Sequence, residues 1–436
     1  MSRQTKEAAL GIIKRLGVQG HQAYLVGGCV RDEMLGRPVK DYDIATSARP
    51  EQVQALFERT VPTGLQHGTI TVLAGREPYE VTTFRREGSY EAFRRPSEVE
   101  YIDSLLEDLQ RRDFTMNAMA LDSEGVLVDP FGGMDDLQQG RLRCVGEAEE
   151  RFREDALRML RCLRFASEYG LQVEGMTWKA LLRSMPLLQH IAMERCRMEL
   201  ERMFGGADPN RALSLLAESG ALRQTKTPLE LAKLDEVPGG SWPDLRELPS
   251  ADERIVLLFL RLGLSSSELR EDMKRMTFSN AQIEAAYKTA EAHQWLCERA
   301  CADYTDNAAR EAWLRASLRT GREALYRLRR IYTLDGERLP GLADGEGGAN
   351  AAAYLRAWIH SGEAWLEAMP AGSLKDLEVS GQEVVQHLET KPGPWTGQVL
   401  NRLLEEAALG WLPNEKNRLL SAAKPIYESL QKKGRT

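Results

Sequence analysis

The sequence predicts an α+β fold, in which a small mixed sheet is followed by a long all-helical region. Up to about residue 138, short apolar runs bounded by Gly and Pro alternate with short helical segments. From Gly146 onward the apolar residues recur at helical spacing almost throughout. A chain of 436 residues is also long enough for roughly two to four domains. We therefore expect a sheet segment up to about residue 138 and helical segments after it.

The first segment contains the predicted strands. In chain order we expect a strand at Tyr24–Val26, a turn at Gly27-Gly28, a helix at Cys29–Leu35, a strand at Asp41–Ala45 and a helix at Glu51–Phe57. Two strand pairs follow, Thr69–Ala74 with Tyr79–Arg85 around a Gly-Arg-Glu-Pro turn, and Met119–Asp122 with Val126–Asp129. These strands are enough for one small sheet.

The helical region is predicted from three strong segments, Glu154–Tyr169, Trp178–Leu188 and Met193–Phe204. Residues 335–350 carry enough Gly and Pro to form a loop or linker before a last helical unit.

Composition excludes several classes of protein. The longest apolar run, Ile255–Leu260, is far shorter than the roughly 20 residues of a membrane span, so we expect no membrane segment. The first residues show no secretory signal, and we expect a cytoplasmic protein. The six cysteines form no C-x-x-C pair, which argues against disulfides and structural zinc. A net charge of -7 argues against a uniformly basic nucleic-acid binder but leaves a local basic patch open.

Three carboxylates are candidates for metal chemistry. Asp41 and Asp43 are two apart on a predicted strand, so their side chains are expected on one face. Two such oxygen ligands suit Mg²⁺, which binds one or two carboxylates together with substrate phosphates. Glu80, in a hairpin strand, could complete a site for phosphoryl transfer. A solvent-facing acidic pair is the alternative interpretation.

The Gly27-Gly28 turn lies between a strand and a helix, where backbone amides and the helix N-terminus can receive a triphosphate. Arg31 follows one turn into the helix and could contact the same group. An ordinary tight turn is the alternative.

Asp155 and Arg158 are three apart on a predicted helix and could face one planar ligand. Adenine and cytosine each present an amino donor beside a ring-nitrogen acceptor, so a carboxylate and a guanidinium would match both. Uracil and guanine reverse this pattern, and each unpaired group would cost about 1 to 3 kcal/mol. The pair would therefore select ATP and CTP, whereas the alternative is a surface ion pair.

Six groups of residues occur in order between residues 25 and 158. They are Leu25–Asp32 with Leu35–Pro38 and Asp41–Thr46, then Gly64–Thr69, Glu80–Arg85, Arg111–Ala118, Asp129–Gly133 and Arg153–Arg158. Together they resemble the motifs of the class II tRNA nucleotidyltransferases and bacterial poly(A) polymerases. The clear resemblance extends to about residue 205, and a weaker likeness to the bacterial tail follows at Pro392–Trp395 and Asn414-Glu415.

This resemblance implies a polymerase β-like catalytic head at 1–138 and a helical neck with a base-reading helix at 139–205. It further implies a helical body at 206–350 and a tail at 351–436 that binds tRNA. The nucleotide-binding residues that it implies are Gly28, Arg31, Arg112, Asp113, Asn117, Asp155, Arg158, Arg161 and Arg164. Among these, Asp113 and Asn117 would bind the ribose, although Asp113 could instead cap a helix at Phe114–Ala118.

Two further segments gain a role from the resemblance. Gly132-Gly133 lies at the junction of sheet and helices, a place for a hinge, although Gly can simply end a strand. Residues 85–96 look like the flexible loop that CCA-adding members keep and CC-adding members lack; a solvated charged loop is the alternative.

The implied activity is template-independent addition of CMP, CMP and AMP, from CTP and ATP, to the 3′ end of tRNA. Asp41 and Asp43 would hold two Mg²⁺ ions, and Asp41, Asp43 and Glu80 would form the catalytic set. A poly(A) polymerase is the main rival, but its basic signature after the Arg-Asp-Phe motif is absent from the sequence. An A-adding or CC-adding specialist stays open, as does the choice between monomer and homodimer.

Two rivals from other classes fit the sequence less well. A catalytically dead RNA-binding protein would need a broken carboxylate pair, and both aspartates are present. A small-molecule nucleotidyltransferase would have no use for the Asp155–Arg158 pair or the long helical region.

Overall fold

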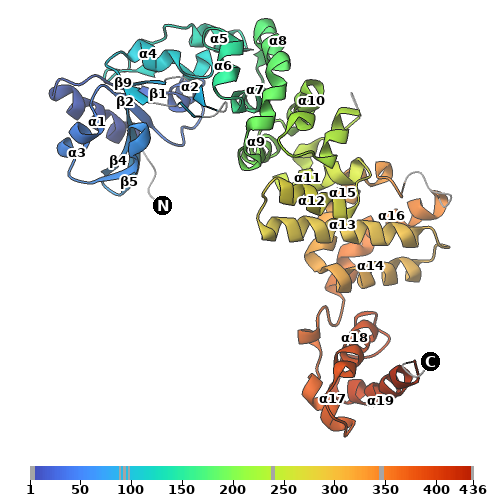
Figure 1. Ribbon diagram of the computed structural model, residues 1–436. Coiled ribbons are helices and arrows are strands. Elements are labelled where there is room, and N and C mark those ends of the chain that lie inside the picture. The colour runs from blue at the N-terminus through green and yellow to red at the C-terminus, as the bar shows by residue number, and fades with distance from the viewer. Residues whose placement is uncertain are drawn as a thin grey trace. The chain divides into compact units, whose positions relative to one another are not determined.

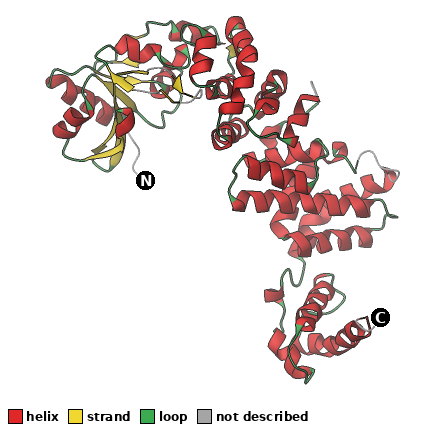
Figure 2. Cartoon of the chain, in the orientation of Figure 1, coloured by secondary structure: helices red, strands yellow, loops and turns green. Residues whose placement is uncertain are grey.

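The computed structural model describes residues 5–87, 90–91, 95–96, 99–236, 241–342 and 348–433. The chain divides into two compact units, Met1–Gly239 and Gly240–Thr436 (Figure 1). Among the described residues the strands all belong to the first unit, and the second is built from helices (Figure 2). The predicted α+β order, sheet first and helices after, is confirmed.

The first unit contains a seven-stranded mixed sheet with the order β11-β10-β1-β2-β5-β4-β3. Its strands are β1 (Ala23–Val26), β2 (Asp43–Thr46), β3 (Thr60–Gly64), β4 (Thr69–Ala74), β5 (Glu77–Thr83), β10 (Ala120–Leu121) and β11 (Leu127–Val128). Strands β2 and β5 run parallel, with Asp43 opposite Glu80, whereas β4 and β5 form the predicted antiparallel hairpin. Sequence analysis found every strand of this sheet except β3, whose middle residues are exposed and carry no apolar alternation. It did not predict the short strands β12 (Arg141–Leu142) and β13 (Gln172–Val173), which pair with each other.

Short helices surround this sheet. They are α1 (Lys6–Val18), α2 (Gly28–Met34), α3 (Pro50–Leu56), α4 (Leu105–Gln110), the 3-10 turn η2 (Thr115–Asn117) and α5 (Gly133–Gln138). Helix α1 was not predicted, although Thr5 caps it and its apolar face is buried. A core that includes Val26, Phe84, Leu109 and Val145 joins the sheet to α4 and to the chain beyond it.

Residues 85–101 form two-stranded ribbons in their described parts. Strand β6 (Arg85–Glu87) pairs with β9 (Val99–Tyr101), and β7 (Tyr90–Glu91) pairs with β8 (Arg95–Pro96). Residues 88–89 and 92–94 of the predicted flexible loop lie outside the described residues.

The remaining α-helices described in the first unit are α6 (Ala148–Glu154), α7 (Leu157–Tyr169), α8 (Gly175–Ser184), α9 (Met193–Gly205) and α10 (Pro209–Ser219). Three 3-10 helices accompany them, η3 (Met185–His190), η4 (Ala221–Gln224) and η5 (Glu230–Glu236). The prediction of one helix from Glu154 to Tyr169 is wrong at its start. Asp155 has extended dihedral angles, and its carboxylate accepts the Leu157 N–H, so α6 ends and α7 begins there.

The second unit contains α11 (Ala251–Arg261), α12 (Ser266–Arg275), α13 (Asn280–Ala300), α14 (Asp306–Thr320), α15 (Arg322–Asp335), α16 (Gly348–Glu367), α17 (Gly381–His387), α18 (Pro394–Ala408) and α19 (Lys416–Lys433). Trp313, Tyr332 and Trp358 are buried and stack on one another between α14, α15 and α16. Of the predicted linker at 335–350, residues 336–342 lie between α15 and α16 and include a 3-10 turn, Gly336–Arg338, whereas 348–350 already belong to α16. Residues 343–347 lie outside the described residues.

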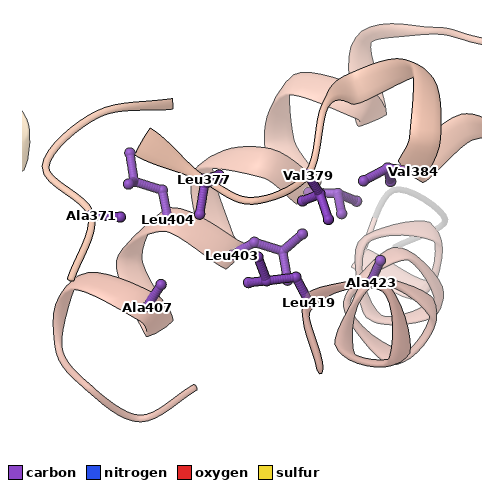
Figure 3. Close-up of a cluster of buried hydrophobic side chains, with 10 residues drawn as sticks. Ala371, Leu377, Val379, Val384, Leu403, Leu404, Ala407, Leu419 and Ala423 are labelled. Carbon is purple, nitrogen blue, oxygen red and sulfur yellow. The ribbon is translucent and has the colours of Figure 1, made fainter. Parts of the chain in front are cut away.

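The last three helices have an apolar core of their own. Leu377, Leu403, Leu404 and Leu419 are buried together in it, with valines and alanines around them (Figure 3). No described helix is long and apolar enough to cross a membrane. The segment boundaries at residues 138, 205 and 350 stay predictions.

Candidate active site

One pocket in the first unit, of about 510 Å³, contains most of the predicted site residues. Ten of them line it, namely Gly28, Arg31, Asp43, Arg112, Asp113, Asn117, Asp155, Arg158, Arg161 and Arg164. Asp41 and Glu80 are outside its lining. These ten residues come from α2, β2, η2, α7 and the segments beside them, so the fold converges on this pocket.

The carboxylates lie at the start of β2 and in the neighbouring strand β5. Asp43 opens β2 and is exposed, while Asp41 precedes the strand, so the prediction that both lie in one strand is wrong. Although solvent reaches the Asp43 side chain, the protein around it still removes part of the hydration of the carboxylate. This desolvation, together with the charges of Glu80 and Asp41, raises the pKa of Asp43 to about 6. Arg112 opposes this shift. Glu80 and Asp41 are thus close enough to Asp43 to repel its carboxylate.

The carboxylates of Asp41, Asp43 and Glu80 are oxygen donors of the kind that a hard divalent cation prefers. Within the described ranges, the carboxylates of Asp41, Asp43 and Glu80 have no hydrogen-bond or ion-pair partner. The described residues contain no cluster of three or more His, Cys, Asp or Glu arranged to hold a metal ion. A divalent cation here would therefore depend on one or two carboxylates, with its remaining ligands from water or substrate.

Gly27 makes the turn between β1 and α2. Its φ of 77° is one that L side chains rarely adopt, and a Cβ there would lie 2.8 Å from Arg112 Nη1. Arg112 makes two long hydrogen bonds, each 3.4 Å, to the Asn117 carbonyl and to Asp108. Its buried Nε has no partner in the described structure. The missing side chain of Gly27 therefore lets a guanidinium with unused donor capacity lie against the turn.

A chain of hydrogen bonds crosses the pocket from α2 to α7. Arg31 Nη1 donates to Asn117 Oδ1 at 2.6 Å, and Asn117 Nδ2 donates to Asp113 Oδ1 at 3.0 Å. Asp113 Oδ2 accepts two N–H groups of Arg161, at 2.8 and 2.6 Å. Burial opposes ionisation of Asp113, but Arg161 and Asn117 outweigh it and lower the pKa.

Asp113 does not cap the following turn in the usual way. Its Oδ1 accepts the N–H of the next residue, Phe114, at 2.8 Å, whereas the N-cap of η2 is Phe114 itself. Both carboxylate oxygens of Asp113 therefore already have two protein donors each.

Asp155 and Arg158 both reach the pocket, but not as neighbours on one helix. Asp155 lies in the break before α7, where Arg195 of α9 donates to both of its oxygens at 3.2 and 2.8 Å. Arg158 lies in the first turn of α7 and donates to Glu154 at 2.5 Å and to the Arg111 carbonyl at 2.9 Å. The break in the helix, and not the i, i+3 spacing, sets their geometry.

The pocket wall beyond Arg161 is aromatic and basic. The guanidinium of Arg164 lies 3.9 Å from the Phe165 ring centroid, and those of Arg161 and Arg31 lie 5.2 and 5.3 Å from it. Arg164 is buried and pairs with Glu199 at 2.6 Å. The aromatic ring and the carboxylate together fix Arg164 in place.

Known proteins resemble this chain over nearly its whole length. A relative from Geobacillus stearothermophilus named CCA-adding enzyme is 37% identical over 99% of this chain and 98% of its own length. The chain belongs to the CCA-adding enzyme family. A second CCA-adding enzyme, from Lactiplantibacillus plantarum, is 35% identical over 97% of each chain. The crystal structure of the Bacillus stearothermophilus CCA-adding enzyme in complex with CTP matches with a TM-score of 0.77, at 35% identity over 98% of each chain.

Family models match in three places. Residues 23–143 match the poly(A) polymerase head domain, residues 170–227 a probable RNA- and SrmB-binding site of polymerase A, and residues 246–423 a putative second domain of tRNA nucleotidyltransferases. The first unit therefore has the polymerase β-like nucleotidyltransferase head of the CCA-adding enzyme family, as the resemblance implied.

Sequence analysis missed several residues that line the pocket of this family member. Arg195, Arg111, Phe165 and Leu157 are among them. Arg195 lies 40 residues from Asp155 in the chain, and nothing in its local sequence marks it as a partner. Arg111 was visible only as part of a motif.

The pocket is lined by many guanidinium groups that can donate to an anion. Seven arginines and three aspartates line it. Several of these arginines are paired with carboxylates behind the wall, such as Glu199 and Asp108, both buried. Each of the seven arginines has a carboxylate within ion-pair distance, so the pocket offers a triphosphate directed N–H donors and not a large surplus of positive charge.

Proposed function

We propose that this member of the CCA-adding enzyme family adds CMP, CMP and AMP to the 3′ end of tRNA, using CTP and ATP and releasing pyrophosphate. One observation carries the proposal: a single pocket joins the metal-binding candidate Asp43 to the base-reading pair Asp155 and Arg158. Full-length relatives named CCA-adding enzyme support it.

Asp41 and Asp43 are the residues that would hold Mg²⁺, with Glu80 beside them. The raised pKa of Asp43 reflects partly desolvated, mutually repelling carboxylates, and a divalent cation would relieve that repulsion. When bound, Mg²⁺ would activate the 3′-hydroxyl of the tRNA primer and neutralise the leaving pyrophosphate.

The arginines would bind and orient the triphosphate. Arg112 has unused donor capacity beside Gly27, and Gly28 and Arg31 are at the N-terminal turn of α2. Arg161 and Arg164 would extend this contact along α7. Since α2 has only seven residues, the guanidinium groups would supply most of the charge that holds the phosphates.

Ribose and base would lie deeper in the pocket. A 2′-hydroxyl on Asp113 would have to replace one of its present donors, because both oxygens are fully used. Asp155 would accept from the amino group of cytosine or adenine, and Arg158 would donate to the ring nitrogen. Arg158 would turn from Glu154 to do so, since that contact occupies its Nη1.

The helical segments are proposed to hold the tRNA. Residues 170–227 match a model described as a probable RNA-binding site, and the tail at 351–436 is the second candidate for this role. Contacts to phosphates and to the shape of the acceptor arm would suffice for this binding. A cytoplasmic location remains a prediction from the sequence.

Three tRNA transcripts test the proposal, ending before the CCA, after the first C and after both Cs. Incubation of each with CTP, ATP and Mg²⁺ should complete the CCA end and then stop. Addition of AMP only to the third transcript would identify an A-adding enzyme, and stalling after two Cs would identify a CC-adding enzyme. Long A tails on oligo(A) primers would identify a poly(A) polymerase.

A further inference from the structure

A buried carboxylate behind the nucleotide pocket has no role in the reaction described above. Asp108 is on α4, and only 1% of its surface is exposed. It does not line the pocket. Its two oxygens nevertheless meet the side chains of two consecutive arginines that do.

Asp108 contacts both arginines and one backbone amide. Arg111 donates to Oδ1 through Nε at 3.0 Å and Nη2 at 2.8 Å, while Arg112 Nη2 donates to Oδ2 at 3.4 Å. Burial opposes ionisation of Asp108, but Arg111 and Arg112 outweigh it and lower its pKa.

The carboxylate is itself held from a second element. The backbone N–H of Arg85, the first residue of β6, donates to Asp108 Oδ1 at 3.3 Å. Asp108 is therefore fixed by α4 and by β6, and its position is set independently of any nucleotide. An arginine side chain has several rotatable bonds, so an anchor of this kind restricts its conformations before the ligand binds.

We propose that Asp108 is a positioning residue of the nucleotide pocket: it holds the guanidinium groups of Arg111 and Arg112 ready for the phosphates. The inference rests on the proposed function for the identity of the ligand. It assigns Asp108 no contact with substrate. Because all nucleoside triphosphates carry the same phosphates, loss of the Asp108 carboxylate should weaken the binding of CTP and of ATP equally.

The test compares two neighbouring carboxylates of α4. Asp108→Asn removes the charge at nearly constant volume and should weaken CTP and ATP binding about tenfold each, measured by isothermal titration without tRNA. Glu107→Gln is the matched control, because Glu107 pairs with Arg86 of β6 and touches neither pocket arginine. Its dissociation constants should stay within about twofold of wild type.

A second background separates positioning from a general loss of structure. In a protein that already carries Arg111→Gln and Arg112→Gln, Asp108→Asn should change the dissociation constants for CTP and ATP by less than about twofold, because no guanidinium is left for Asp108 to hold. A loss of affinity there as large as in the wild-type background would overturn the proposal.

Stability is checked by recording the thermal unfolding of each variant. If Asp108→Asn does not fold, Asp108→Glu keeps the charge but displaces the carboxylate by one methylene, and it should show the same loss of affinity. Unchanged affinity in either folded variant would overturn the proposal. Failure of the wild-type protein to extend tRNA would instead refute the proposed function and leave the nucleotide titrations valid.

Discussion

Replacement of Gly133 by Ala should destabilise the catalytic unit. Gly133 opens α5, and a Cβ there would lie 2.2 Å from the Thr115 carbonyl oxygen and 3.0 Å from Met119 Cγ. The closest obstacle is backbone of η2, which cannot rotate aside as a side chain could. Since φ at Gly133 is not in the left-handed region, the expected cost comes from this contact and not from the backbone conformation.

The contact must open by about 1 Å to reach an ordinary separation, and overpacking of this kind costs about 1 to 3 kcal/mol. For a unit of this size, that free energy corresponds to a fall of about 2 to 12 °C in the midpoint of its unfolding transition. Asn117, which bridges Arg31 and Asp113, is two residues from Thr115 in the same turn. Nucleotide addition should therefore weaken together with stability.

Gly175→Ala is the matched control, because Gly175 is also the first residue of its helix, α8, and has no atom within 4 Å of the added methyl position. It should leave the midpoint unchanged or raise it slightly. Scanning calorimetry of both variants, with incorporation of labelled CMP into tRNA, measures the two effects. A Gly133→Ala protein that unfolds within about 1 °C of wild type would refute the packing argument.

Four further predictions concern the site residues and the loop beside them. Asp41→Ala and Asp43→Ala should each lower the rate of nucleotide addition about a thousandfold or more with little change in tRNA affinity, and activity within tenfold of wild type would remove either residue from the metal site. The folded-state pKa of Asp43 is about 6, above its ordinary value of 3.8, so the ionised group opposes folding at higher pH. Without metal, Asp43→Asn should therefore raise the free energy of unfolding at pH 8, by about 1 kcal/mol or less because the side chain is exposed. This gain in stability should vanish as the pH falls towards 4. Arg158→Glu or Asp155→Lys should erode the preference for CTP and ATP over UTP and GTP in steady-state kinetics, and unchanged selectivity would show that the base is read elsewhere. Shortening of residues 85–96 should leave CMP addition largely intact and impair AMP addition on a transcript that ends in CC; equal loss at both steps would argue against a role in the switch between bases.

The sheet and the Gly27-Gly28 turn could be predicted because their signals are local. Alternating apolar residues marked β4 and β5, and the Gly27-Gly28 pair marked a turn that requires a positive φ at Gly27. The break between α6 and α7 could not be predicted in this way. Its cause is partly distant, because Asp155 is held by Arg195, a residue of another helix.

The same distinction applies to the site. The motifs predicted most of the residues that line the pocket. They did not indicate that the arginines among them are paired with carboxylates. Glu199 behind Arg164 and Asp108 behind Arg111 are both buried, and neither follows from helical periodicity. A buried acidic residue interrupts the apolar pattern of a helix, so its burial cannot be predicted until its partner is known.

These paired arginines change what the pocket can do. Seven unpaired guanidinium groups would attract any polyanion, including pyrophosphate and stray RNA, with little regard to shape. Arg161 on Asp113 and Arg164 on Glu199 have much of that charge neutralised and their directions fixed. A nucleotide would therefore gain most binding free energy where its own acceptor groups meet guanidinium donors that already point at them. The carboxylates behind the wall would thus lower the affinity for anions in general and favour a ligand whose groups lie in the right positions.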